Sequence, residues 1–400
     1  LGWFGGGDAS LAGRTPCGMT FTGTVLLLNH ADAAGFQGGD GLQMRQTALW
    51  LRRWGVEVRL ENSDQPDLAG VDLVHVFNCR HLHHFAPQVS AIGEAGIPFV
   101  VSPIWIPLAE ALWGSRCAEA VLKAIVEQPA EAASMLKKLA RRAFTVVLEG
   151  QGCKYPEGYL ALQERQAEIS TWLSQASGLV VNSWLELQAV RRDLRWFQSQ
   201  VAVAPYGVDP AAFLNADPQV FRQWSGIEAP FVLQAGRIEP AKNQAMLLYA
   251  LRHDSLSVVL AGSDINSPEY GQLCRVIGGE RVHITGHLPP HLLASAYAAA
   301  QVHVLPSWCE TCGLVSLEAA LSGTPVVAST VGHEAEYLRG DAWYADPGDP
   351  ESLRLAVLEA IAAGRESDRC RRLRRRVLSD YSWDKLAEGT LGLYCQVIGC

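Results

Sequence analysis

The sequence predicts an α/β protein built from two doubly wound parallel-sheet domains. Short continuous apolar runs alternate with segments of helical periodicity along most of the chain. Runs that are apolar on both faces and separated by helices are typical of parallel strands covered on each side. The alternation stops at a turn-rich stretch, residues 205–218, and then starts again. This restart indicates a second unit of the same kind.

The first expected domain covers residues 23–205 and contains a helical insert. A glycine-rich turn, residues 35–41, separates the first strand from a segment of helical spacing, residues 42–54. Between residues 107 and 176 the strand signal is missing, and segments rich in Ala, Leu, Glu and Arg indicate helices. The expected strands are Val25–Leu28, Val56–Leu60, Leu73–Phe77, Pro98–Val101, Leu179–Val181 and Val201–Ala204.

The second expected domain covers residues 206–380, and a terminal helical segment follows it. Two doubly wound units in one chain form a cleft that faces the carboxyl ends of both sheets, and we expect the ligand there. The expected strands are Phe231–Gln234, Ser257–Leu260, Val282–Thr285, Val302–Leu305, Pro325–Ala328 and Trp343–Tyr344, and the helical segments near the end are Glu351–Leu378 and Trp383–Ile398.

Composition narrows the class of protein. The 400 residues are 48% hydrophobic and 18% charged, with a formal net charge of −8. Such a chain can fill two cores, and its acidic balance argues against a protein that coats nucleic acid. It has no apolar run long enough for a transmembrane helix and no signal-peptide pattern at its start. We expect residues 1–22 to be a disordered or artefactual leader.

The segment VHVLPSWCETCGLVSLEAALSGTPVV, residues 302–327, predicts a strand, a turn, a short helix and another strand. Gly313 opens the helix without a Cβ, so a ligand can approach the backbone closely. The N–H groups of Gly313, Leu314 and Val315 then form a helix N-terminus suited to an anion. Glu310 precedes the helix and Glu318 follows two turns later. On the residues alone, two solvated acids in an ordinary αβ unit remain an equal alternative.

A second motif is GRIEPAKNQAMLLYAL, residues 236–251, at the end of a buried strand. After Gly236, the cations Arg237 and Lys242 flank a turn and can neutralise a diphosphate, Arg as a fork and Lys as a point charge. A surface loop with two solvated cations is the alternative. The chain has no Walker lysine and no G-x-G-x-x-G, which disfavours an NTPase and a nicotinamide dehydrogenase.

These motifs resemble those of retaining glycosyltransferases of family 4, the glycosyl transferases group 1, which have the two-domain GT-B fold. The resemblance implies that Glu310 lies by the donor sugar, that Glu318 bonds the nucleotide ribose, and that Arg237 and Lys242 hold the leaving diphosphate. It also implies that residues 381–400 form a helix that returns to the first domain. The matching positions are Gly236, Arg237, Lys242, Glu310, Gly313, Leu314, Glu318, Ala319, Gly323, Thr324, Pro325, Val326 and Val327, with weaker matches at residues 181–183, 205–209, 286–288 and 381–383.

The resemblance implies a transferase that moves a sugar from a UDP-, GDP- or ADP-sugar to a glycan or glycolipid, with retention of anomeric configuration. We expect no metal cofactor, because the leaving diphosphate is already an anion and no DxD-like cluster appears in the motifs, and no nucleic-acid partner, because the chain is acidic. We expect a cytoplasmic location, with peripheral membrane contact and oligomeric state left open. His287 and Leu288 are expected beside the nucleobase. A sugar-nucleotide epimerase or a non-catalytic binder on the same fold remains the alternative.

The first domain supplies the candidates for acceptor contact. The glycines Gly38 and Gly39 are expected to border the donor phosphate. Many relatives carry a His after the fourth strand, whereas this chain has SPIWIP, residues 102–107, so that contact is expected to be absent or supplied otherwise. Trp105 there is a possible wall for a sugar, although a lone Trp is more often packed core. The acceptor-side candidates are Asp40, Ser102, Trp105 and His81.

Two further clusters suggest other chemistry. His81, His83 and His84 follow the third strand, but no carboxylate or Cys at ligand spacing accompanies them except Cys79. We therefore expect a cleft-lining or surface role and no metal. Cys309 and Cys312 have the CxxC spacing of a thiol-disulfide oxidoreductase, in which a helix N-terminus lowers a thiol pKa. We expect reduced thiols instead, because redox chemistry leaves Glu310 unexplained.

Overall fold

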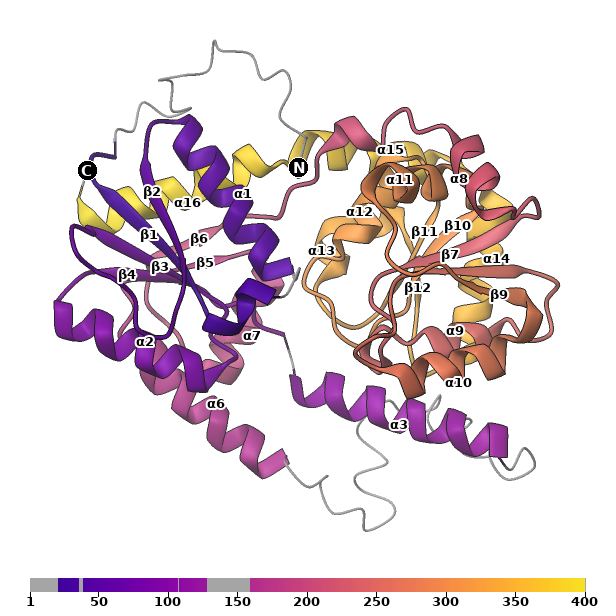
Figure 1. The fold of residues 1–400 in the computed structure, drawn as a ribbon, viewed down its shortest axis with the longest axis horizontal. Coiled ribbons are helices and arrows are strands. Elements are labelled where there is room, and N and C mark those ends of the chain that lie inside the picture. The colour runs from indigo at the N-terminus through magenta and orange to yellow at the C-terminus, as the bar shows by residue number, and fades with distance from the viewer. Residues whose placement is uncertain (1–20, 36–38, 107, 128–158, 400) are drawn as a thin grey trace. The chain divides into compact units, whose positions relative to one another are not determined.

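The computed structural model describes residues 21–35, 39–106, 108–127 and 159–399, which divide into two compact units (Figure 1). The first unit comprises the chain up to Trp105, Gln163–Gly207 and Tyr381–Cys400. The second comprises Ile106–Leu162 and Val208–Asp380. Both are α/β units, as the alternating pattern predicts. No helix in the described ranges is both long and apolar enough to cross a membrane.

The first unit contains a six-stranded parallel sheet in the order β2-β1-β3-β4-β5-β6. Each strand expected from the sequence is present, with ends shifted by a few residues. The strands are β1 (Thr24–Asn29), β2 (Glu57–Asn62), β3 (Leu73–Phe77), β4 (Phe99–Ser102), β5 (Gly178–Val181) and β6 (Val201–Val203). The helical elements are η2 (Ala31–Gly35), α1 (Gly39–Arg53), α2 (Leu82–Ala95), α6 (Tyr159–Leu173), α7 (Trp184–Leu194) and α16 (Trp383–Ile398).

The last helix, α16, belongs to the first unit, although more than 170 residues separate it from the rest of that unit. It packs against α1, β5 and β6. The Tyr394 hydroxyl lies 2.7 Å from Nδ1 of the buried His75 on β3. Gly207 lies so close to the backbone of Trp383 that a Cβ at residue 207 would overlap it. The expected return of the terminal helix to the first domain is therefore confirmed.

The second unit contains a six-stranded parallel sheet in the order β12-β11-β10-β7-β8-β9. Every strand expected in this half is also present. The strands are β7 (Phe231–Ala235), β8 (Ser257–Ala261), β9 (Val282–Ile284), β10 (Val302–Leu305), β11 (Val326–Ser329) and β12 (Trp343–Ala345). The helical elements are α3 (Leu108–Glu127), η3 (Pro210–Ala212), α8 (Pro218–Ser225), η4 (Pro240–Lys242), α9 (Gln244–Ala250), α10 (Pro268–Gly278), η5 (Gly279–Arg281), α11 (Pro290–Ala299), α12 (Leu314–Leu321), α13 (Glu334–Leu338), η6 (Arg339–Asp341), α14 (Pro350–Ala363) and α15 (Asp368–Asp380).

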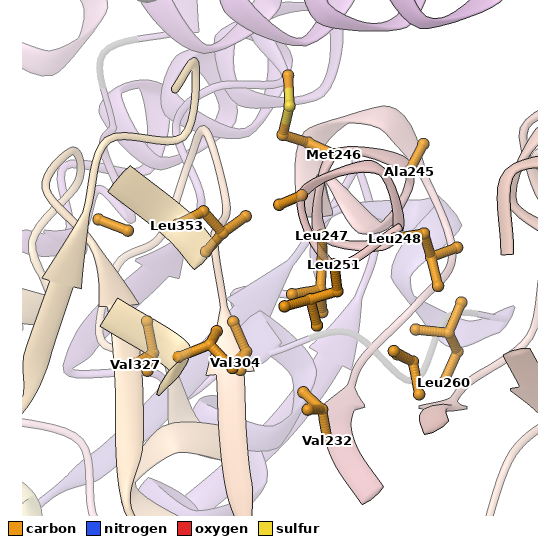
Figure 2. Packing of buried hydrophobic residues seen from close by; sticks show 14 of the residues in the cluster. Val232, Ala245, Met246, Leu247, Leu248, Leu251, Leu260, Val304, Val327 and Leu353 are labelled. Atoms are coloured by element: carbon orange, nitrogen blue, oxygen red, sulfur yellow. The ribbon is translucent and has the colours of Figure 1, made fainter. Parts of the chain in front are cut away.

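The core of the second unit lies between its sheet and the helices α9 and α14 (Figure 2). Leu247 of α9 and Leu251, which directly follows α9, point toward Val232 of β7 and are fully buried. The apolar stripe of α9 thus covers the strands that carry the motif residues at their carboxyl ends. Gly364, with φ of 71°, ends α14. The segment expected between residues 351 and 378 therefore forms two helices, α14 and α15, because a left-handed residue stops the first.

Helix α3 packs on the second unit, whereas the sequence places residues 107–176 as an insert of the first. It contacts η4, α9 and α10. The Trp308 ring lies directly on Gly114 of α3, where a Cβ would overlap it. An amphipathic pattern predicts a buried helix face but does not identify the surface that covers it, which explains the different placement.

Candidate functional site

The strand order of the second sheet brings the two sequence motifs together. Strands β7 and β10 are neighbours, with Val232 paired to Val302, although β8 and β9 follow β7 in the chain. The strand order therefore reverses between β7 and β10. In open α/β sheets, ligands bind outside the carboxyl ends of the strands at such a switch point. The segments that follow these two strands are residues 236–242 and 306–313, which carry both motifs.

Lys242 and Glu310 form an ion pair at this switch point. Lys242 ends η4 after β7, and Glu310 lies in the loop after β10, with only 9% of its surface exposed. The Ser307 hydroxyl donates a second hydrogen bond, 3.0 Å long, to Oε1 of Glu310. Burial alone would lower the pKa of Lys242, but the adjacent Glu310 carboxylate outweighs it and raises the pKa. A charged ammonium is therefore fixed beside a carboxylate at the carboxyl ends of β7 and β10.

Gly313 and helix α12 lie next to this pair. Gly313 has φ of 63°, the left-handed region that favours glycine, and caps α12. The first-turn N–H groups of a helix have no partner within the helix, so those of Leu314 and Val315 suit an anion. Gly313 is buried, and Leu314 and Val315 are half-buried. The expected helix N-terminus is thus present beside Lys242 and Glu310.

Glu334 is a site residue that the sequence analysis missed. It begins α13 and is fully buried. Its side chain lies on Gly313, where a Cβ would overlap the carboxyl group. Burial, reinforced by the charge of Glu310, raises the pKa of Glu334 well above its ordinary value. A carboxyl group in a five-residue helix carries no periodic signal that would have identified it.

Arg237 lies in the same loop but points to solvent. Its side chain is 62% exposed, and its guanidinium bonds Oε1 of Glu239 at 3.2 Å. The loop itself is fixed, because the Gly236 carbonyl lies where a Cβ of Gly262 would be. Gly262 follows β8, so the ends of β7 and β8 approach closely. The structure thus places Arg237 in the loop of Lys242, outside the Lys242–Glu310 pair.

Glu318 and the turn after β9 contain the remaining residues that the sequence predicts on the donor side. Glu318, on the second turn of α12, accepts a 3.1 Å hydrogen bond from the Tyr297 hydroxyl. Burial raises the pKa of Glu318 to about 7. His287 is exposed and Leu288 is buried. They follow β9, which is an edge strand of the sheet and is separated from β7 by β8.

In the first unit, two of the acceptor-side candidates come close to each other through His30. Asp40, near the start of α1, accepts a 3.1 Å hydrogen bond from Asn78, and its Oδ2 lies 3.6 Å from Nε2 of His30. The His30 and His81 rings are 4.7 Å apart. Burial and the neighbouring cations lower the pKa of His81 to about 4. Gly39 begins α1, and Gly38 lies outside the described residues.

The other two acceptor-side candidates are core residues, which argues against their expected role. Trp105 has no exposed surface, and its ring N–H bonds Asp193 at 2.9 Å. Ser102 is 1% exposed, and its hydroxyl lies 2.9 Å from Nε2 of His75. A side chain whose polar atoms are paired inside the core offers no face to a sugar. Trp105 packs among apolar residues of the core, as a lone Trp more often does.

The CxxC pair does not have the environment of a redox site. Cys309 is half-buried and Cys312 is buried, and the two are not joined by a disulfide. Burial, with Glu310 and Glu334 nearby, raises the pKa of Cys312 well above its ordinary value. A redox-active cysteine needs a lowered pKa, because the thiolate is the reacting species.

Comparison with known proteins finds a match to one family model and several similar glycosyltransferases. Residues 229–363 match the family model described as glycosyl transferases group 1, and this range includes both motifs. The chain is 31% identical over 241 residues to a D-inositol 3-phosphate glycosyltransferase of Nocardia farcinica, covering 56% of this chain and 53% of the relative. It is 27% identical to an alpha-maltose-1-phosphate synthase of Mycolicibacterium smegmatis over 58% of this chain and 67% of the relative. The chain thus spans about half the length of the first of these relatives.

Solved structures extend the similarity to the whole fold. A sucrose-phosphate synthase from Thermosynechococcus elongatus superposes with a TM-score of 0.69 at 19% identity, over 94% of this chain and 100% of that one. Anabaena Alr3699/HepE in complex with UDP and glucose gives a TM-score of 0.67 at 17% identity, over 93% and 99% of the two chains. With two doubly wound domains and these structural similarities the chain has the GT-B fold, and its second domain, which carries both motifs at one switch point, is similar to the glycosyl transferases group 1.

Proposed function

We propose that this protein transfers a sugar from a nucleotide-diphosphate sugar to the hydroxyl group of an acceptor, with retention of anomeric configuration. The observation that supports this most is the Lys242–Glu310 pair beside the N-terminus of α12, at the switch point of the second sheet. The pair combines a fixed cation for a leaving phosphate with a carboxylate that can accept hydrogen bonds from sugar hydroxyls.

In this proposal, three groups stabilise the charge that develops on the leaving diphosphate. Lys242 is held charged by Glu310. The first-turn N–H groups of α12 add the partial positive charge of a helix N-terminus. Arg237, exposed in the loop that ends at Lys242, can leave Glu239 and form a fork on phosphate oxygens. Groups already in place when charge develops lower the barrier more than solvent does.

The proposed chemical step is a front-side displacement. The bond between the anomeric carbon and the phosphate oxygen breaks, and its electron pair leaves with the diphosphate. The acceptor oxygen forms its bond to the anomeric carbon from the same face, which retains the configuration. The acceptor proton passes to the departing phosphate oxygen. With two side-chain cations and a helix end on the phosphates, we propose that this step needs no metal at the diphosphate.

The donor and acceptor classes remain part of the proposal. The structures of Anabaena Alr3699/HepE hold UDP and UDP-glucose, so UDP-glucose is the first donor to test, followed by GDP- and ADP-sugars. We propose Glu318 for the ribose, with His287 and Leu288 beside the base. The acceptor would be a growing glycan or glycolipid that meets Asp40 and His81 in the first unit.

The test is a transfer assay on the full chain, with release of nucleoside diphosphate and the NMR signal of the new anomeric centre as readouts. We expect Glu310→Ala and Arg237→Ala each to reduce transfer at least 100-fold, a size typical of one lost transition-state donor. Arg275→Ala is the matched control, because Arg275 is also an exposed arginine paired to an acid of the same unit. Near-normal transfer by Glu310→Ala and Arg237→Ala, or an inverted product, would overturn the proposal.

A further inference from the structure

The sheet of the first unit has its own switch point, and polar side chains gather there. Strands β1 and β3 are neighbours, while β2 lies on the other side of β1, so the strand order reverses between β1 and β3. Residues that follow these two strands include His30 and Asp32 after β1 and His84 after β3. Ligands of open α/β sheets bind at such a position. None of these three residues takes part in the donor-site chemistry proposed above.

His30, Asp32 and His84 each place one metal-ligating atom within 4.8 Å of the others. Nε2 of His84 lies 3.1 Å from Oδ2 of Asp32. Two ligand atoms on a tetrahedral zinc ion, each about 2.0–2.1 Å from it, stand at a similar separation from each other. Two imidazole nitrogens and one carboxylate oxygen are the ligand set of a three-residue zinc site that keeps one position open.

The carboxylate on the other side of His84 is also placed as in a metal site. Nδ1 of His84, the nitrogen that faces away from Asp32, lies 2.8 Å from the Asp64 carboxylate. A metal-bound histidine commonly donates its second ring N–H to such a carboxylate, which fixes the ring and its tautomer. His84 is only 7% exposed, so its orientation is set by packing as well.

His30 gives a second, independent indication of a ligand. It is 9% exposed, its Nδ1 has no hydrogen-bond partner among the described residues, and its Nε2 is 3.6 Å from Asp40, too long for a hydrogen bond. Leaving a buried polar atom without a partner is unfavourable, because the atom has lost its hydrogen bonds to water. An ion pair of His84 with Asp32 and Asp64 would satisfy those three residues but leave His30 unpaired. A cation between His30, Asp32 and His84, bound by a ring nitrogen of His30, would give that ring a partner.

We propose that His30, Asp32 and His84 bind one divalent transition-metal ion, of the zinc class, with Asp64 as the carboxylate that orients His84. The site borders the acceptor-side candidates Asp40 and His81, because His30 contacts both. The open coordination position would then take water or an oxygen of a bound molecule. The proposal is independent of the donor chemistry, since it rests on the first unit alone.

The test measures zinc binding directly, on the full chain without a histidine tag. Metal-stripped protein is titrated with Zn²⁺ by calorimetry, and Co²⁺ absorption reports the ligand field. We expect one ion per chain with a dissociation constant below about 1 µM. Asp64→Asn should weaken binding by about 10–100-fold, as an orienting carboxylate does, and His84→Ala and Asp32→Asn by more. His83→Ala is the matched control, because His83 is exposed and adjacent to His84.

Asp32→Asn keeps the test decisive if His84→Ala does not fold, because the Asp32 side chain is 68% exposed. Circular dichroism confirms that each variant is folded. The proposal is overturned if the wild type binds no stoichiometric zinc, which would leave His84 as an imidazolium between two carboxylates. It is also overturned if Asp32→Asn binds zinc as the wild type does, or if His83→Ala loses as much affinity as His84→Ala.

Discussion

The carboxyl group of Glu334 lies directly on the Cα of Gly313, in the space that a side chain at residue 313 would need. This contact joins the start of α13 to the start of α12 beside the Lys242–Glu310 pair. It requires glycine for two reasons, the positive φ and the lack of room. It also keeps a buried carboxyl group close to the charge of Glu310.

Gly313→Ala should therefore be more destabilising than an ordinary glycine substitution at positive φ. The left-handed backbone alone costs an alanine about 1–2 kcal/mol, and overpacking against Glu334 adds about 1–3 kcal/mol. Gly323→Ala is the matched control, since Gly323 has φ of 73° with no atom within 4 Å of its Cβ position. Urea denaturation measures the free energy of unfolding of both variants. Equal losses would show that Glu334 does not occupy the space beside Gly313.

Glu334 should make the protein less stable as pH rises. Its pKa is raised in the folded state, so above pH ~4.5 the folded state holds this proton more tightly than the unfolded state does. The free energy of unfolding then falls as pH increases from this value. We expect Glu334→Gln to make that slope shallower, leaving the part that comes from other buried carboxyl groups such as Glu318, measured by denaturation between pH 5 and pH 8. Glu228→Gln, an exposed control in the same unit, should keep it. An unchanged slope in Glu334→Gln would contradict the assignment.

Substitutions of Lys242 and Arg237 should differ in their effect on stability although both should reduce activity. Lys242→Met leaves the nearly buried Glu310 carboxylate unpaired, at a cost on the order of 3 kcal/mol. Arg237→Met removes an exposed pair and should change the free energy of unfolding by less than about 1 kcal/mol. Both should impair transfer if the chain acts as proposed. Denaturation curves with the transfer assay check this, and a large stability loss in Arg237→Met would contradict the exposed position.

Substitution of Gly114 tests whether α3 packs against Trp308. Because the Trp308 ring occupies the Cβ position, Gly114→Ala should cost about 1–3 kcal/mol despite the better helix propensity of alanine. Gly93→Ala, in helix α2, has only a 3.8 Å contact with Gln175 and should gain about 0.5–1 kcal/mol. Thermal unfolding of both variants measures these two changes in stability. A stabilising Gly114→Ala would mean that α3 does not pack on Trp308.

The sequence predicted the strands well because each buried parallel strand is a short apolar run between polar or glycine-rich turns. It also singled out Lys242 and Glu310, which the structure brings into one ion pair, since each follows such a run in a recognisable motif. Glu334 could not be found in this way, because what distinguishes it is burial against Gly313. Trp105 could have been read as core from its apolar surroundings, and the sequence left both possibilities open.

The His30, Asp32 and His84 cluster shows why chain order hides a site. In the sequence, His81, His83 and His84 stand together without a carboxylate at ligand spacing. Asp32 and Asp64 reach His84 only because β1, β2 and β3 are adjacent in the sheet. Spacing along the chain cannot report contacts that the strand order creates.

We propose that the switch point between β7 and β10 binds a nucleoside diphosphate through Arg237, Lys242 and the start of α12. Calorimetric titration of UDP, GDP and ADP into the full chain and into Arg237→Ala tests it most directly. We predict binding of at least one diphosphate, weakened by about 10–100-fold in Arg237→Ala, as one lost charged hydrogen-bonding group implies. Arg275→Ala should bind as the wild type does. Equal affinity in wild type and Arg237→Ala, or no binding of any diphosphate, would contradict the account.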